Sequence, residues 1–254
     1  MTPSSTLVLA RYDVDPHSTP GPISTVTGAR IGFVGCPLLA HSVRTESQPR
    51  FRAIAILQRD SEIATRVVET DPKVDAIERE VEQFVIRMLA LRQPLAADLR
   101  NIVAALKITG DLERIGDYAS NVAKRSIVLS QFNLSLSLSG LGHMAQLVQG
   151  NLKLIIDAVS ENDAEKAIQV WRSDQMIDDL YNTVFRELIT YMMEDPRNIT
   201  PCTHLLFIAK NLERIGDHAT NIAETVHYAV KGEPLTEMRP KGDTSAYAVV
   251  RPRE

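Results

Sequence analysis

Two nearly identical stretches of twelve residues, one hundred positions apart, constrain the fold of this chain more than any other feature. LERIGDYASNVA occupies residues 112–123 and LERIGDHATNIA occupies residues 212–223. A second matching pair, DPKVDAIEREVEQF and DQMIDDLYNTVFRE, precedes them at an offset of 103 residues. The two offsets differ within a turn, where changes of length are tolerated. The chain therefore uses one structural unit twice and is not a solenoid of many repeats.

Apolar residues recur at helical spacing through both copies, and helix-boundary signals separate the helices. Asp71 followed by Pro72 is typical of a helix start, whereas Gln93 before Pro94 is typical of a helix end. Asp60 and the pair Asn162–Asp163 are expected to cap short helices. Long helices are expected over residues 72–92, 95–128, 141–159, 174–194 and 202–230. Short loops between them imply antiparallel neighbours, so the predicted fold class is all-α, with two tandem helical bundles.

The expected domain organisation follows from these patterns. Residues 1–50 hold six prolines and four glycines and show neither a helical nor a strand period, so an irregular or disordered segment is predicted there. The remaining parts are a first helical unit over 51–129, a serine-rich linker over 130–140, a second bundle over 141–231 and a flexible tail over 232–254.

Charge and composition limit the partners and the location of the protein. The net charge of -4 gives no electrostatic footprint for nucleic acid. No apolar run approaches the roughly 18–20 residues that span a bilayer. The two cysteines, Cys36 and Cys202, are far apart and suit a reducing compartment. We therefore expect a cytoplasmic protein with no transmembrane segment and no nucleic-acid partner.

Each unit carries two pairs of acids spaced four residues apart, one pair on each of its two long helices. The pairs are Asp71 with Asp75, Glu113 with Asp117, Asp174 with Asp178, and Glu213 with Asp217. Residues at this spacing share a helix face, where like charges destabilise the helix by roughly 0.2–0.5 kcal/mol. Antiparallel packing would bring four carboxylates together in each unit. Such a set is suited to binding Mg²⁺, Mn²⁺ or Fe.

Two simpler interpretations compete with a metal site. A pair of acids on a helix is usually a solvated face, here with a neighbouring arginine as partner, and Asp71 and Asp174 are placed as helix caps. Repetition favours metal binding, because duplicated units must share their core but need not share surface acids. Gly116 and Gly216 lie in mid-helix at a cost of roughly 1 kcal/mol each relative to alanine. Close helix approach or room for ligands would explain both glycines.

No set of residues in the sequence is typical of a catalytic nucleophile with its base. The six histidines lie outside any recognisable triad. His218 follows the second acidic motif, but the matching residue of the first copy is Tyr118, so an ordinary, partly exposed histidine is expected. Glu224 and His227 have the spacing found in ferritin-like di-iron bundles, which need such a pair on two helices. The sequence therefore predicts no catalytic residues.

The motifs LERIGDYASNVAKR and LERIGDHATNIAE, with LRQPLAADLRNIVAALKI before the first, resemble those of the PhoU family of phosphate-signalling regulators. The resemblance runs from about Phe51 to Val230. It implies two three-helix bundles in a protein that often forms a homodimer. It also implies that the eight acids named above bind multinuclear clusters of Fe, Mn, Mg or Zn on the bundle surface.

The resemblance further implies negative regulation of phosphate uptake and of the phosphate-starvation response. The implied partners are the phosphate ABC transporter and a sensor histidine kinase, through which the protein would reach the membrane. One feature departs from the family: only Arg52–Gln58 fit the end of its long opening helix, so the first unit is predicted to be truncated. A carboxylate-bridged metalloenzyme and a purely structural helical adaptor without metal remain as alternatives.

Overall fold

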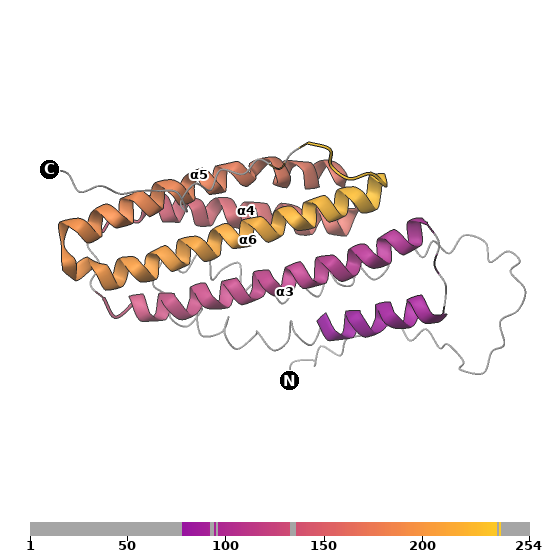
Figure 1. Cartoon of the computed structure of the whole chain (residues 1–254), viewed down its shortest axis with the longest axis horizontal. Coiled ribbons are helices and arrows are strands. Elements are labelled where there is room, and N and C mark those ends of the chain that lie inside the picture. Colours follow the sequence, from indigo (N-terminus) through magenta and orange to yellow (C-terminus); the bar gives the residue numbers. More distant parts are fainter. Residues whose placement is uncertain (1–77, 92–93, 95, 133–135, 238, 240–254) are drawn as a thin grey trace, which may run out of the picture. The chain divides into compact units, whose positions relative to one another are not determined.

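The structure is a computed structural model of the 254-residue chain, and it describes residues 78–91, 94, 96–132, 136–237 and 239. Within these ranges every regular element is helical, which confirms the all-α prediction. Residues 78–91 form one helix. The elements that follow are α3 (Ala97–Leu129), α4 (Ser139–Glu161), α5 (Ala164–Glu194), the short 3₁₀ helix η2 (Pro196–Asn198) and α6 (Ile199–Lys231) (Figure 1).

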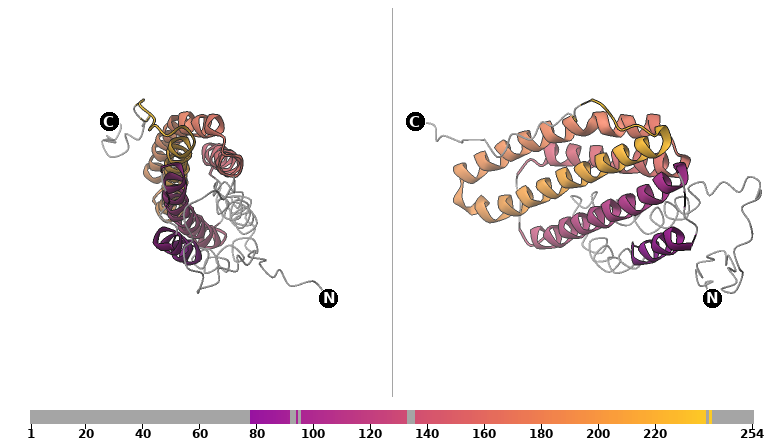
Figure 2. Two further views of the ribbon diagram at one scale, coloured as in Figure 1. Left: turned by 90° about the vertical axis from the view of Figure 1, so that its right-hand side faces the viewer. Right: turned by 45° about the vertical axis from the view of Figure 1, so that its right-hand side comes forward.

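Helices α4, α5 and α6 form a three-helix bundle. Each packs against the other two, and the end-on view in Figure 2 places their axes at the corners of a triangle. The bundle core consists mainly of aliphatic side chains such as Met144, Leu152 and Ile208, all fully buried. Amphipathic helices of this kind obtain most of their stability from burying the apolar face, so the bundle explains why these segments are helical.

Helix α3 packs along α6, and the two run in opposite directions (Figure 1). The rings of Tyr118 on α3 and His218 on α6 lie 5.6 Å apart between centroids. Towards the other end of the contact, the guanidinium of Arg125 lies 4.0 Å from the ring centroid of Phe207. The two copies of the repeated motif are therefore on neighbouring helices and face each other across the contact.

Local capping explains where α5 begins, but the predicted break inside α5 is wrong. Asp163 caps the helix, because its carboxylate accepts hydrogen bonds from the backbone N–H groups of Glu165 and Lys166. The helix then continues without interruption past Asp174, where a new helix was expected. Asp174 is only 2% exposed in the middle of α5, so its interpretation as a helix cap is also wrong.

Gly216 allows α5 and α6 to approach closely. A Cβ atom at this position would lie 2.8 Å from Cδ1 of Ile177, a side chain that is only 1% exposed. The close helix approach that the repeated glycine suggested is therefore present in the second unit. Its counterpart, Gly116, is buried in α3.

Several predictions concern parts of the chain outside the described residues. They are the irregular segment 1–50, the remnant of the opening helix at Arg52–Gln58, the cap at Asp60, and the acids Asp71 and Asp75. In the part of the chain that is described, no helix combines the length and the apolar character that crossing a bilayer requires.

Replacing Gly216 with alanine should destabilise the protein by about 0.5–2 kcal/mol, because crowding of the buried Ile177 side chain outweighs the gain in helix propensity of about 0.5–1 kcal/mol. Urea unfolding measures the change. Gly150→Ala in α4 is the matched control, since a Cβ atom there meets nothing within 4 Å and helix propensity should raise the stability by about 0.5–1 kcal/mol. The double variant Gly216→Ala/Ile177→Val should recover part of the loss, because it removes Cδ1. A Gly216→Ala protein as stable as the wild type would contradict this account of the helix contact.

Candidate functional site

The acids predicted for the second unit lie where α5 packs against α6. Asp174, Asp178 and Glu213 are buried, with 2%, 4% and 5% of their surface exposed. The side chain of Asp217 is 30% exposed. All four acids lie on these two packed helices. The burial of Asp174, Asp178 and Glu213 excludes a simple solvated face as the explanation for these three acids.

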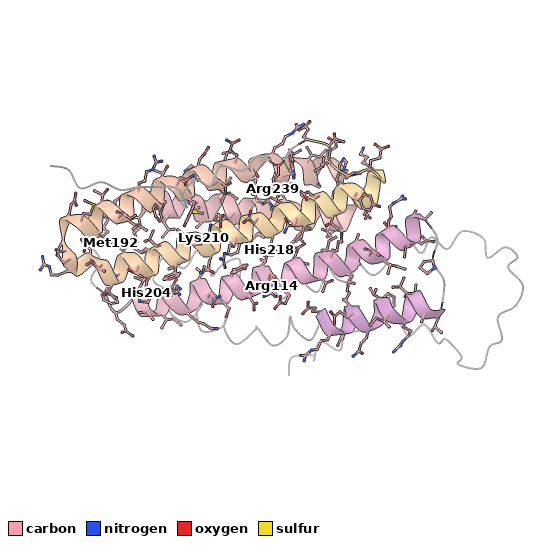
Figure 3. The ribbon with its side chains drawn as sticks, viewed as in Figure 1. Arg114, Met192, His204, Lys210, His218 and Arg239 are labelled. Carbon is pink, nitrogen blue, oxygen red and sulfur yellow. The ribbon has the colours of Figure 1, made fainter. Side chains whose placement is uncertain are left out.

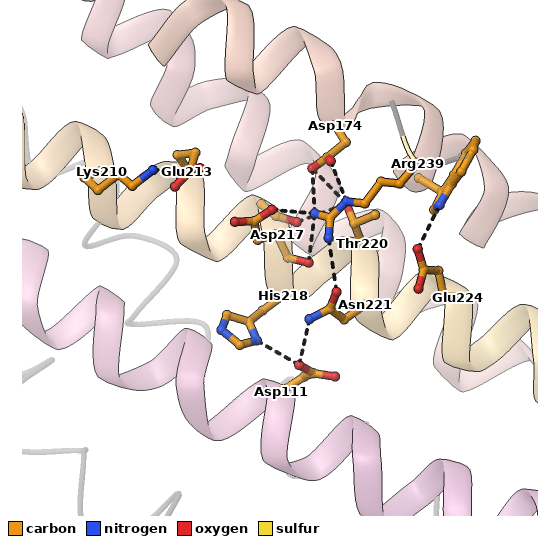
Figure 4. A network of polar contacts seen from close by, with 12 residues as sticks. Asp111, Asp174, Lys210, Glu213, Asp217, His218, Thr220, Asn221, Glu224 and Arg239 are labelled. Carbon is orange, nitrogen blue, oxygen red and sulfur yellow. Dashed lines mark hydrogen bonds and ion pairs between the residues drawn. The ribbon is translucent and has the colours of Figure 1, made fainter. Parts of the chain in front are cut away.

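Arg239, which follows α6 in the chain, bridges Asp174 and Asp217 (Figure 4). Its Nε donates to Oδ2 of Asp174 at 2.8 Å, and its Nη2 donates to Oδ1 of Asp217 at 2.6 Å. Its Nη1 donates to the amide oxygen of Asn221 at 3.2 Å, and the hydroxyl of Thr220 donates to Oδ1 of Asp174 at 3.0 Å. Charge-assisted bonds of this kind are among the strongest in proteins.

The pKa of Arg239 shows that the bridge outweighs the cost of burial. Burial alone favours the neutral guanidine, but the hydrogen bond to Asp174 and the charges of Asp174 and Asp217 raise the pKa of Arg239 above its ordinary value. The side chain is 17% exposed. Arg239 is therefore a permanent cation placed between two carboxylates.

A second basic residue, Lys210, forms an ion pair with another acid of the second unit, Glu213. Nζ of Lys210, which is labelled in Figure 3, lies 3.0 Å from Oε1 of Glu213 (Figure 4). The same atom lies 4.8 Å from the ring centroid of Tyr181 on α5. Arg214, the neighbouring arginine expected beside Asp217, lies over the ring of Tyr118 at 5.5 Å. Lys210 and Arg239 thus pair with acids of the second unit, and no pattern in the sequence indicates either of them.

The described acids of the first unit differ from those of the second, because no arginine forms a short bridge between them. Glu113 and Asp117 lie on α3, and the side chain of Asp117 is 40% exposed. Arg114 is 3.6 Å from a carboxylate oxygen of each of them, which is longer than a hydrogen bond. The other two predicted acids of this unit, Asp71 and Asp75, are outside the described residues.

The pKa of Glu113 is raised to about 7. Burial is the largest cause, followed by the negative charge of Asp117; Arg114 opposes the shift, and Glu78 and a hydrogen bond with Asp117 add to it. The repulsion expected from two acids one helical turn apart is therefore present at this pair. A carboxylate in such surroundings gains from any cation that binds beside it.

An open groove of about 500 Å³ runs beside Glu113, between the helix of residues 78–91, α3 and α6. The charged residues that line it are Glu78, Lys107, Asp111, Glu113, Arg114 and Glu224. Two contacts tie this region to the second unit. His218 lies with Nδ1 2.8 Å from a carboxylate oxygen of Asp111, and the indole N–H of Trp171 donates to Glu224 at 3.1 Å.

The residues of the second unit do not fit a metal ion while Arg239 is in place. Its guanidinium binds both Asp174 and Asp217, the two carboxylates between which a cation would lie. Across the described ranges, no group of three or more His, Cys, Asp and Glu side chains is arranged to hold a metal. For the first unit the predicted site stays a prediction, because two of its four acids are outside those ranges.

The fold and the site together define a class of protein. Proteins of this class contain a helical unit that has been duplicated. The two copies of its acidic motif lie on neighbouring antiparallel helices, here α3 and α6. The chain belongs to the PhoU domain family, which matches residues 52–126 and 141–226. The family resemblance inferred from the repeated motif is therefore confirmed.

Similar proteins cover most of the chain. The phosphate-specific transport system accessory protein PhoU homolog of Caulobacter vibrioides is 51% identical over 199 residues, which are 78% of this chain and 86% of that protein. The corresponding protein of Rhizobium meliloti is 47% identical over 193 residues, 76% of this chain and 81% of its own length. The crystal structure of PhoU from Pseudomonas aeruginosa has a TM-score of 0.73 and 39% identity, covering 79% of this chain and 96% of that one. This likeness confirms the tandem duplication of the bundle.

The raised pKa of Glu113 predicts how stability depends on pH. The unfolded chain releases this proton near the ordinary pKa of 4.5 and the folded chain near 7, so the folded state binds more protons between these values. The contribution of Glu113 to stability should therefore be full below pH 4.5 and fall as the pH rises to 7. Chemical unfolding from pH 4.5 to 8 measures this slope, and Glu113→Gln should reduce it. Glu194→Gln, on the exposed end of α5, is the matched control. An identical slope in the Glu113→Gln and Glu194→Gln proteins would refute the assignment.

Proposed function

We infer that this protein is an accessory regulator of phosphate transport that represses phosphate uptake and the phosphate-starvation response. The observation that carries the proposal is the 51% identity, over most of both chains, with a protein named as an accessory of the phosphate-specific transport system. The fold supports the same conclusion, since it is that of a solved PhoU protein at 39% identity.

The proposed partners are the phosphate ABC transporter and a sensor histidine kinase. The name of the relatives supports the transporter, and the resemblance of the repeated motifs supports the kinase. The protein would work from the cytoplasm, as a homodimer, and would reach the membrane through these partners. It would act by binding rather than by turnover, because its sequence shows no nucleophile–base set.

The proposal includes cation binding by the acids of the first unit. Glu113 and Asp117 supply oxygen ligands that suit Mn²⁺, Mg²⁺ or Fe, and Asp71 and Asp75 are the expected additional ligands. The elevated pKa of Glu113 supports this assignment, because a bound cation would relieve the repulsion that raises it. A cation here would also change the charge of the groove between α3 and α6, which is the surface we propose for partner binding.

Repression tested in the living cell separates a regulator from the alternatives. In cells lacking the chromosomal copy, the wild-type protein should restore repression of a phosphate-starvation reporter in phosphate-rich medium. Glu113→Gln/Asp117→Asn should lose most of it and should recover less transporter and kinase in a pull-down. Glu194→Gln is the control for a lost surface charge, and immunoblotting confirms equal protein levels. Full repression by the double variant would show that these acids are not needed. A wild-type protein that does not restore repression would refute the proposed function.

A further inference from the structure

The second acidic motif is here the set Asp174, Asp178, Glu213 and Asp217 on α5 and α6. We propose that the chain carries its own competitor for this motif: Arg239 closes it to metal ions, and a divalent cation binds there only when the guanidinium leaves. The segment concerned is Gly232–Glu237 together with Arg239, called here the C-terminal strap. The inference takes from the proposed function only the divalent cation as the competing ligand. It goes further, because it assigns different states to the two copies of the motif.

The strap is anchored along the second bundle before it reaches the acids. Gly232 ends α6 with a left-handed φ of 80°, and its N–H donates to the carbonyl of Tyr228 at 2.9 Å, which turns the chain back. His227 contacts the carbonyl oxygen of Glu233 at 3.1 Å, and Leu235 packs against the hydrophobic core. The strap is visible in Figure 1 as the yellow segment that turns back at the end of α6.

The length of the strap fits this return. The helix from Lys231 back to Asn221 is about 15 Å long, at about 1.5 Å per residue. Residues 232–239 reach at most about 26–29 Å when fully extended. The strap can therefore bring Arg239 level with Asp217 and Asn221 without strain. This slack also lets Arg239 withdraw while Gly232 and Leu235 stay in place.

The two copies of the motif differ at the positions that supply positive charge. Lys210 corresponds to Gly110 in the first copy, and the residue one hundred positions before Arg239 is Ser139. Tyr181, which Lys210 contacts, corresponds to Glu78 at the offset of 103 residues. The first copy thus lacks both internal cations at the matching positions and has one more acid. The acids themselves are identical in the two copies, so the difference lies in how they are neutralised.

Burial of Asp174 couples the release of Arg239 to the binding of another cation. The side chain of Asp174 is only 3% exposed, and a buried carboxylate without a positive partner strongly destabilises a fold. Arg239 is itself held at the end of a short strap. Its departure is therefore favourable only when another cation takes its place, so that binding of a divalent ion promotes release of the strap. Release of the strap would change the surface of the bundle, and a partner protein could recognise the changed surface.

Mn²⁺ binding to the full chain tests the proposal. Free Mn²⁺ is followed by electron paramagnetic resonance while wild-type, Arg239→Gln and Arg197→Gln proteins are titrated. Arg197 is the matched control, because its side chain is 90% exposed and pairs with Asp195 outside the acidic set. We expect Arg239→Gln to bind Mn²⁺ at the second motif at least about tenfold more tightly than the wild type, because the competing guanidinium is gone. Arg197→Gln should match the wild type.

The single tryptophan gives a local readout that does not depend on activity. Trp171 lies on α5 three residues before Asp174, so Mn²⁺ at the second motif should quench its emission. Quenching should appear with Arg239→Gln at Mn²⁺ concentrations that leave the wild type unchanged. The double variant Arg239→Gln/Asp174→Asn removes the buried charge with its partner, and it should fold yet show neither the tighter binding nor the quenching.

Further variants keep the outcomes distinct. If Arg239→Gln folds only after Mn²⁺ is added, the proposal is supported. If Arg239→Gln does not fold at all, Arg239→Lys is tested instead. A lysine cannot bridge both carboxylates, so the Arg239→Lys protein should bind Mn²⁺ more tightly than the wild type. Equal Mn²⁺ binding in Arg239→Gln, Arg239→Lys and wild-type proteins overturns the inference. Loss of Mn²⁺ binding in Glu113→Gln/Asp117→Asn reports on the first motif alone, so it tests the proposed function separately.

Discussion

A carboxylate buried between packed helices needs a positive partner, and this requirement governs the second half of the molecule. Gly216 brings α5 and α6 close together, and Asp174 is almost completely enclosed there, at 2% exposure. An unpaired charge in such a place would strongly destabilise the bundle. The guanidinium of Arg239 meets the need by binding Asp174 and Asp217 together, and Thr220 completes the hydrogen bonding of Asp174.

The same requirement is met differently in the two copies of the motif. In the second copy, Lys210 and Arg239 come from the chain itself. In the first copy, Arg114 stays 3.6 Å from both acids, and the pKa of Glu113 is raised to about 7. Duplication therefore preserved the acids while the surroundings diverged. The acids of the second copy are partly neutralised by cations of the chain itself, whereas Glu113 and Asp117 of the first copy have no cation within hydrogen-bonding distance among the described residues.

Much of this fold could be predicted from the sequence, because the signals are local. Helical periodicity located α4 and α6, Asp163 marked the start of α5, and the repeated glycine indicated close helix packing. The interpretation of Asp174 as a helix cap was wrong, because the preference of aspartate for caps concerns the neighbouring backbone and carries no information about burial between helices. Arg239 could not be found, because it follows Asp174 by 65 residues and no periodic pattern links the strap to α5.

We propose that the identical acidic motifs hold different cations in the two halves. Anomalous diffraction from crystals soaked in Mn²⁺ tests it most directly, because it locates each bound ion among the side chains. We expect an anomalous peak beside Glu113 and Asp117, with the guanidinium of Arg239 still lying between Asp174 and Asp217. A peak between Asp174 and Asp217 with none beside Glu113 would contradict it.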